Sequence, residues 1–291
     1  MKVKLFAAVV LLLTVCPIAA LAGTYTTDFD EATLPELSPG VVLLGGDATA
    51  SIGSSQLVLD DATGLGLFQQ NRFLILPGAP ATAFTSGFDI TVVLDGSTIE
   101  GMKTCPSAWS GILVFGSPLS NPAPLVVFGP CGQPETTFLS LFAVPAAQWP
   151  PGPAMAVCAV NRAGGNRIPW STPLAATPTD TTLRVVVDNS TPPNATFYVD
   201  GTPVLSDYQI GPNQIVATGV VQQAVHYPPG SPAPAITTTV ESLQVTGNEV
   251  PTYPVAPMAS AVSFVSLGIL AIVMAALVAI IGTRKRGDAH A

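Results

Sequence analysis

Three tryptophans are the side chains of this chain best suited to binding a sugar. Carbohydrate recognition uses an aromatic surface with polar groups beside it, and Trp109, Trp149 and Trp170 are the candidates. Trp149 stands in the stretch AQWPPG, which its prolines stiffen and which we expect at the surface. The alternative for each tryptophan is packing against the protein's own sheets.

Residues for acid–base or nucleophilic catalysis are scarce. The chain holds two histidines, His226 in a proline-rich stretch and His290 beside the C-terminus, and no Gly-x-Ser-x-Gly sequence. A histidine in such a loop is better explained as a solvated residue than as a general base. This scarcity favours a protein that is not an enzyme.

Three cysteines lie beyond the apolar N-terminal segment: Cys105, Cys131 and Cys158. They form no Cys-x-x-Cys pair, so a zinc or redox site is not indicated. Residues 111–117 and 125–130 predict a hairpin with Cys105 and Cys131 toward its open end, so we expect these two to form a disulfide. Such a bond would stabilise the fold by about 2–4 kcal/mol. Cys158, inside an apolar strand, is expected to be a buried thiol.

Charge is sparse and strongly acidic between the two apolar ends of the chain. Residues 23–261 carry five basic and 17 acidic side chains, a net charge near −12. This field repels nucleic acid, which excludes nucleic-acid partners. The 29 prolines and 26 glycines alternate with apolar, β-branched runs that can form a core.

The elements that must position these residues are short strands. Runs rich in Val, Leu, Thr and Phe are bounded by turn residues, and no stretch of this region shows a helical period. Asp200-Gly201 predicts a tight hairpin turn. The pattern indicates one all-β domain over residues 23–248, a sandwich or barrel. The predicted strands are 56–61, 88–96, 111–117, 125–130, 136–144, 155–161, 182–189, 196–205 and 237–247.

Both ends of the chain carry export and anchoring signals. Lys2 and Lys4, an apolar run and the small residues around Leu21 predict a signal peptide over 1–22. After a proline-rich linker, 249–261, the 21 uncharged residues 262–282 can span a bilayer as a helix.

The basic cluster Arg284 to Arg286 then predicts that residues 283–291 form a short cytoplasmic tail. These segments together predict an exported, single-pass type I membrane protein, with residues 23–248 at the cell surface or in the envelope.

The C-terminal segment also resembles a known sorting signal. EVPTYP (Glu249–Pro254), the apolar span and the basic cluster together resemble the C-terminal signals of bacterial exosortase substrates. The resemblance implies a sorting peptidase as a partner, which would remove the span and hand the domain to the envelope. An ordinary membrane anchor is the alternative.

The order of strands resembles the concanavalin A-like lectin and glucanase superfamily. GDATASIGSSQLVLDDATG (Gly46–Gly64) looks like the early strands of legume-type lectins, and FTSGFDITVVLDG (Phe84–Gly96) follows as it does there. LRVVVDN with ATFYVDGTPVLSD is similar to a strand pair of concanavalin A-like and laminin G-like domains, and TTTVESLQV looks like their closing strand. The resemblance implies a two-sheet antiparallel jelly roll, with TDFDEA (Thr27–Ala32) beside the closing strand.

Two site expectations follow from this resemblance. In related sandwiches a calcium ion joins the first strand to the last, so Asp28, Asp30 and Glu241 are candidate ligands, because calcium prefers oxygen. A solvated acidic edge is the alternative. Glucanases of the superfamily carry Glu-x-Asp-x-x-Glu on one strand, and none of the six glutamates of this chain stands in that spacing.

The sequence therefore predicts a surface-anchored, non-enzymatic β-sandwich module that binds carbohydrate or extracellular matrix or serves in adhesion. A structural envelope protein with no small ligand is the first alternative, and a divergent glycoside hydrolase is the second.

Overall fold

The computed structural model describes residues 23–30, 41–44, 49–60, 68–105, 108–116, 123–132, 144, 146–160, 166–211, 214–225 and 236–251. All of them belong to one compact unit that ends at Thr252. The predicted signal peptide, linker, span and tail lie outside the described residues, apart from the first three residues of the linker. No helix in the described part of the chain is long and apolar enough to cross a membrane.

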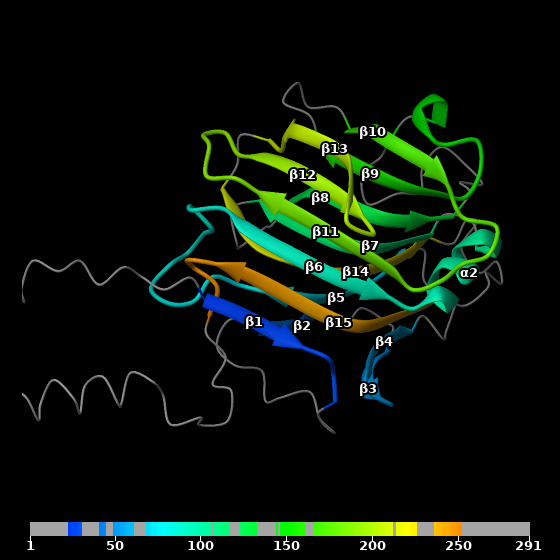
Figure 1. Cartoon of the computed structure of the whole chain (residues 1–291), viewed down its shortest axis with the longest axis horizontal. Helices are drawn as coiled ribbons and strands as arrows, with labels where there is room; N and C mark the ends of the chain where they lie inside the picture. Colours follow the sequence, from blue (N-terminus) through cyan, green and yellow to red (C-terminus); the bar gives the residue numbers. More distant parts are fainter. Residues whose placement is uncertain are drawn as a thin grey trace, which may run out of the picture. The chain divides into compact units, whose positions relative to one another are not determined.

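Two antiparallel sheets pack face to face in the described residues (Figure 1). The predicted two-sheet antiparallel sandwich is thereby confirmed. Sheet A runs in the order β13 (Thr202–Gln209), β12 (Asn194–Val199), β11 (Thr181–Val187), β6 (Phe88–Leu94), β15 (Thr237–Gly247), β4 (Gln56–Asp60) and β3 (Thr49–Gly53), with β1 (Gly23–Thr27) also on β15. Sheet B runs in the order β10 (Asn166–Pro173), β9 (Ala154–Val160), β8 (Ala123–Cys131), β7 (Ala108–Gly116), β14 (Ile215–Val225), β5 (Phe68–Ile75) and β2 (Val41–Leu44).

Sheet A has one buried face and one face toward solvent. Along β6 buried and half-buried residues alternate from Phe88 to Leu94, and β11 repeats the pattern. This alternation is what a half-buried strand requires, and it made these strands visible in the sequence. On the outer face Arg184 donates to both carboxylate oxygens of Asp89 and lies over the ring of Tyr198.

The central strands of sheet B are buried on both faces, whereas the edge strand β10 has exposed side chains such as Arg167 and Thr172. Every residue of β7 is buried, although successive side chains point to opposite sides of a strand. The inner face meets sheet A, where the rings of Phe128 and Phe197 lie 5.4 Å apart. The outer face forms a second apolar cluster that includes Leu113, Val127 and Val144.

The predicted hairpins are present. β7 pairs with β8, and β12 pairs with β13. The turn between β12 and β13 places Asp200 and Gly201 at φ of 48° and 76°, in the left-handed region that the Asp-Gly pair tolerates.

The first and last strands of the described region pair, although not over the residues expected. β1 pairs with β15 from Gly23 opposite Gly247 to Thr27 opposite Leu243. The paired segment therefore ends at Thr27, where the resemblance placed its beginning.

One helix was missed in the sequence: α2, Gly96–Thr104. Asp95 caps it by accepting a hydrogen bond from the Ser97 N–H at 2.7 Å. The helix buries Thr98, Ile99 and Met102, and its two glycines and two threonines weaken any helical signal in the sequence.

The predicted Cys105–Cys131 disulfide is wrong for this structure, which leaves both as thiols. The backbone of Cys105 lies close in space to that of Gly132, the residue after Cys131. The side chains of the two cysteines nevertheless belong to different clusters. Cys105 packs with Met102 and Ile236, whereas Cys131 lies in the outer cluster of sheet B and donates to the Ala154 carbonyl at 3.2 Å. Cys158 is buried, as expected.

Candidate functional site

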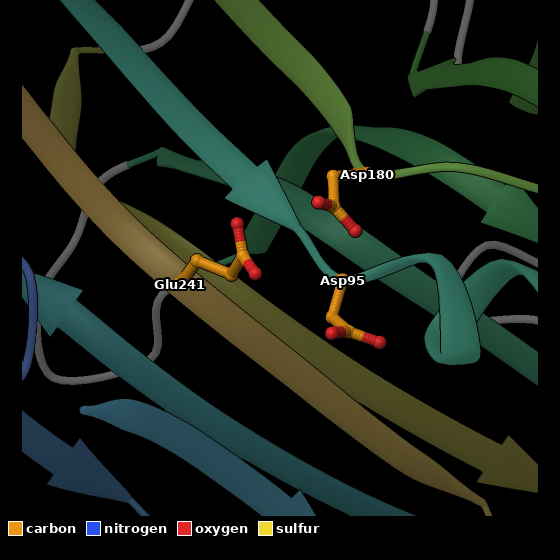
Figure 2. A group of neighbouring side chains, drawn as sticks. All are labelled: Asp95, Asp180 and Glu241. Carbon is orange, nitrogen blue, oxygen red and sulfur yellow. The ribbon is translucent and has the colours of Figure 1, made fainter. Parts of the chain in front are cut away.

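Three carboxylates meet where β6 ends and β11 begins in sheet A, beside the middle of β15. Leu94 of β6 pairs with Thr181 of β11 and with Val240 of β15. Asp95 and Asp180 each stand one residue beyond this row, and Glu241 is the extra residue between this row and the next, opposite Val93, so the register of the sheet brings the three together (Figure 2). One carboxylate oxygen from each lies within 4.8 Å of the others.

Local backbone features fix the direction of each acid. Asp95 caps α2, and Asp180 accepts a hydrogen bond from the Gly96 N–H at 3.0 Å. A register shift between Val240 and Ser242 makes Glu241 the extra residue of its strand. These three features place side chains that are far apart in the sequence at one end of the sandwich.

The pKa values of the group reflect crowding of negative charge. Burial raises the pKa of Glu241, and the neighbouring charges of Asp180 and Asp95 raise it further. The pKa of Asp95 is lowered, mainly by its hydrogen bonds from Ser97. A nearby cation would therefore favour the ionised form of Glu241.

The geometry fits a hard cation. Calcium binds oxygens at about 2.3–2.6 Å, so two ligands of one ion lie at most about 5 Å apart. The separations here, up to 4.8 Å, meet that limit. The three residues could hold calcium, with its remaining positions filled by water or ligand oxygens.

The calcium ligands expected from the sequence are only partly brought together. Glu241 belongs to the acidic group, but Asp28 and Asp30 belong to no group of three potential ligands among the described residues. The reason is the length of β1, which ends at Thr27 opposite Leu243, before it reaches Glu241. Asp28 instead accepts a hydrogen bond from the Asp30 N–H at 3.3 Å.

The candidate tryptophans lie in or beside sheet B. Trp109 is only 3% exposed, and its ring lies 5.7 Å from that of the half-buried Trp149. Trp149 donates its ring N–H to the Val144 carbonyl at 3.1 Å. Trp170 is half-buried and packs edge-on against Phe128. Trp109 is thus part of the outer apolar cluster of sheet B, Trp149 packs against that cluster, and Trp170 lies apart from both. Sugar contact by any of the three remains a prediction.

Two neighbouring buried glutamines of β14 differ in their hydrogen bonds. Gln222 accepts from Asn71 at 2.8 Å and donates to the Ile236 carbonyl at 2.9 Å. Gln223, paired across the strands with Trp109, has a buried Oε1 with no partner, and the indole N–H of Trp109 also has none. One water molecule, which both donates and accepts, would satisfy the two groups.

Sheet B lacks the groups that glycoside hydrolysis requires. That reaction uses a pair of carboxylates flanking the bond to be cleaved. The seven strands of sheet B contain no aspartate and no glutamate. A pair of acids on the strands of this sheet is therefore excluded.

Comparisons with known proteins find similarity of structure only. No protein-family model matches the chain, and no curated protein matches its sequence. The carbohydrate recognition domain of Emp47p is 9% identical, with a TM-score of 0.45 over 79% of this chain and 99% of that domain. A GlcNAcα1-4Gal-releasing endo-β-galactosidase from Clostridium perfringens is 11% identical, with a TM-score of 0.47 over 79% of this chain and 64% of the enzyme.

A third structure, LamAcat from Zobellia galactanivorans, is 9% identical, with a TM-score of 0.42 over 76% of this chain and 96% of that one. The likeness to these three proteins is one of chain fold alone. At TM-scores below 0.5 they carry no function to this chain, whose function has to be inferred from its own residues.

Proposed function

We propose that the chain is a non-catalytic β-sandwich module that is held at the cell surface or in the envelope and binds glycans. The observation that carries the non-catalytic part is sheet B, whose strands contain no carboxylate and whose outer face is closed by buried apolar side chains. The acids of the described strands all belong to sheet A.

Export and anchoring belong to the same proposal. A signal peptide over 1–22 and a span over 262–282 would bracket the sandwich, and a sorting peptidase would act on the EVPTYP segment. The pairing of Gly23 with Gly247 supports this arrangement, because the first and last strands of the sandwich lie side by side and the two proposed segments adjoin them in sequence. Its acidic charge also suits a neutral or cationic partner rather than a polyanion.

Calcium is the proposed cofactor, held by Asp95, Asp180 and Glu241. Asp95 directly follows β6, Asp180 directly precedes β11, and Glu241 lies in β15. An ion bound by all three would therefore connect these strands. The ion would neutralise the three crowded carboxylates and orient the loop before β11.

A glycan array tests the proposed function. The full-length protein, in a detergent without a sugar headgroup, is applied with calcium and with a chelator. We expect binding to a subset of neutral glycans. Silence across the array under both conditions would favour the purely structural envelope protein, for which the closed outer face of sheet B is the specific support.

The hydrolase alternative needs its own assay. Release of reducing sugar from a polysaccharide panel would revive it. Activity that survives Glu100→Gln and Glu135→Gln would leave that hydrolase without either acid as its proton donor.

A further inference from the structure

A cavity of about 310 Å³ opens at the end of the sandwich away from the acidic group. Val187, at the end of β11, pairs with Phe88, at the start of β6, and lines the cavity. Two segments form its walls: Asp188 with residues 190–193, and Phe84-Thr85 with Gln214-Ile215. The buried lining residues are apolar (Phe84, Val187 and Ile215) and form the floor, whereas the exposed Thr85, Thr191 and Gln214 form a polar rim.

The first wall is held rigid by one carboxylate. Asp188 accepts hydrogen bonds from the Ser190 N–H at 3.0 Å and from the Asn194 N–H at 2.9 Å, and also from both of their side chains. Pro192 and Pro193 complete this wall. Four hydrogen bonds to one carboxylate and two prolines mean that little order has to be gained when a ligand binds.

The second wall is also fixed before any ligand arrives. The Phe84 N–H donates to the Ile215 carbonyl at 2.8 Å, and the Phe84 ring lies 5.0 Å from that of Phe88. The exposed hydroxyls of Thr85 and Ser86 both donate to Glu249 Oε1, at 2.7 and 2.8 Å. Of the two, Thr85 lines the cavity, and with its hydrogen committed its hydroxyl oxygen can only accept from a ligand.

The charge around the cavity is negative. Within the described part of the chain its lining includes Asp188 and no lysine, arginine or histidine, and Glu249 accepts the hydrogen bond of the Thr85 hydroxyl. Burial acts to raise the pKa of Glu249, but hydrogen bonds from Thr85 and Ser86 outweigh it and lower the pKa. Both carboxylates are therefore ionised at neutral pH, and an anionic ligand would be repelled.

Size, acceptors and charge together define the occupant. The volume is at the lower end of small-molecule sites, which suits one ring rather than a chain. An apolar floor suits the C–H face of a ring, and acceptor oxygens on the rim require a ligand with hydroxyl donors. We propose that this cavity binds the single terminal ring of a neutral glycan and rejects uronic and sialic acids. This inference rests on the proposed glycan-binding function.

Ligand-observed saturation-transfer NMR on the full-length protein tests the inference. The probes are the methyl glycosides of glucose, galactose, mannose and N-acetylglucosamine, with methyl glucuronide as the anionic counterpart of the glucoside. We expect transfer to at least one neutral probe and none to the glucuronide.

Two matched variants locate the signal. Gln214→Trp places an indole at the exposed rim of the cavity and should reduce the transfer at least fivefold. Gln244→Trp, at an exposed glutamine on the outer face of sheet A, should leave it unchanged. Thr85→Val, which removes one rim acceptor, should weaken binding several-fold, and thermal unfolding of each variant verifies that it is folded.

The outcomes separate this inference from the proposed function. Undiminished transfer in Gln214→Trp, or equal transfer to the glucuronide, overturns the inference and leaves glycan binding standing. The same holds if the array detects long glycans while no methyl glycoside gives transfer. Silence in both the array and the NMR experiment overturns the proposed function itself.

Discussion

Replacing Glu241 by glutamine tests whether the acidic group is a cation site. Without a cation, the three carboxylates repel one another and reduce the stability of the folded state. Glu241→Gln removes one charge and two repulsions while it keeps the size of the side chain. The variant should therefore be more stable than the wild type in a chelator and should respond less to calcium.

The structure sets the magnitude of the repulsion. At 4.8 Å, the limit that the three oxygens satisfy, two unit charges in water repel by about 0.9 kcal/mol. At physiological salt the Debye length is about 8 Å, which reduces this to about 0.5 kcal/mol per pair. Removing two pairs should raise the free energy of unfolding by about 1 kcal/mol.

Calcium should cancel the stability advantage of the variant. A site of extracellular type with a Kd of about 1 mM would stabilise the wild type by about 1.4 kcal/mol in 10 mM calcium. Glu241→Gln, which loses one charged ligand, should gain less than about 0.5 kcal/mol. Wild type and variant, about 1 kcal/mol apart in chelator, should therefore become nearly equal in calcium.

Urea unfolding of the purified protein followed by tryptophan fluorescence measures these differences. Sodium chloride at matched ionic strength controls for screening. Asp207→Asn controls for loss of an exposed carboxylate outside the group, at a position with φ of 52° that asparagine also accepts. A variant that is less stable than the wild type in chelator, with no calcium effect beyond that of sodium chloride, would refute both the repulsion and the site.

Three further predictions concern other parts of the sandwich. Gln223→Met removes an unpartnered buried oxygen, so in urea unfolding it should be neutral or stabilising by up to about 1 kcal/mol. Gln222→Met breaks two buried hydrogen bonds, so it should destabilise the fold by about 1–3 kcal/mol. Equal losses of stability in the two variants would contradict this contrast. Burial acts to raise the pKa of Asp188, but hydrogen bonds from its own loop outweigh it and lower the pKa. Asp188 therefore stabilises the fold above its unfolded pKa of about 3.9, and the stability lost in Asp188→Asn should shrink as pH falls below that value in acid-unfolding curves. Burial raises the pKa of Cys131 to about 12 and that of Cys158 well above its ordinary value, so mass spectrometry after maleimide treatment should find both thiols modified only in urea; labelling in buffer would show that the outer cluster opens.

Sheet A could be predicted from the sequence because water reaches one of its faces. The alternation of β6 and β11, and the Asp-Gly turn after β12, were enough to place those strands. In sheet B the short apolar runs predicted β7, β8 and β9, whereas β5 and β14, which combine apolar residues with buried polar ones and show no alternation, were missed, although β14 lies near the middle of the sheet. The apolar, β-branched run Ile215–Val221 was the available signal for β14.

The acidic group could not be predicted, because register rather than spacing creates it. Asp95, Asp180 and Glu241 are distant in sequence, and only the pairing of Leu94 with Thr181 and Val240 aligns them. Asp28 and Asp30 were predicted as calcium ligands together with Glu241, but they are not in the acidic group. The sequence does not show that β1 ends at Thr27, which determines where these two residues lie. The cap at Asp95 was recognisable as an Asp before a possible helix, but an Asp-Gly pair is equally typical of a turn.

The burial of sheet B has a consequence for where ligands can bind. Strands that are buried on both faces, such as β7, offer no side chain to a solute, so we expect binding at the ends of strands. Both candidate sites lie there, at opposite ends of the β6–β11 pair, which spans seven residues from Phe88 to Leu94. At about 3.3 Å per residue the sites are about 20 Å apart. The free-energy effects of substitutions that far apart are additive. Glu241→Gln should therefore leave sugar binding unchanged, and Gln214→Trp should leave the calcium response unchanged. A loss of both functions in either variant would mean that the two ends communicate through these strands.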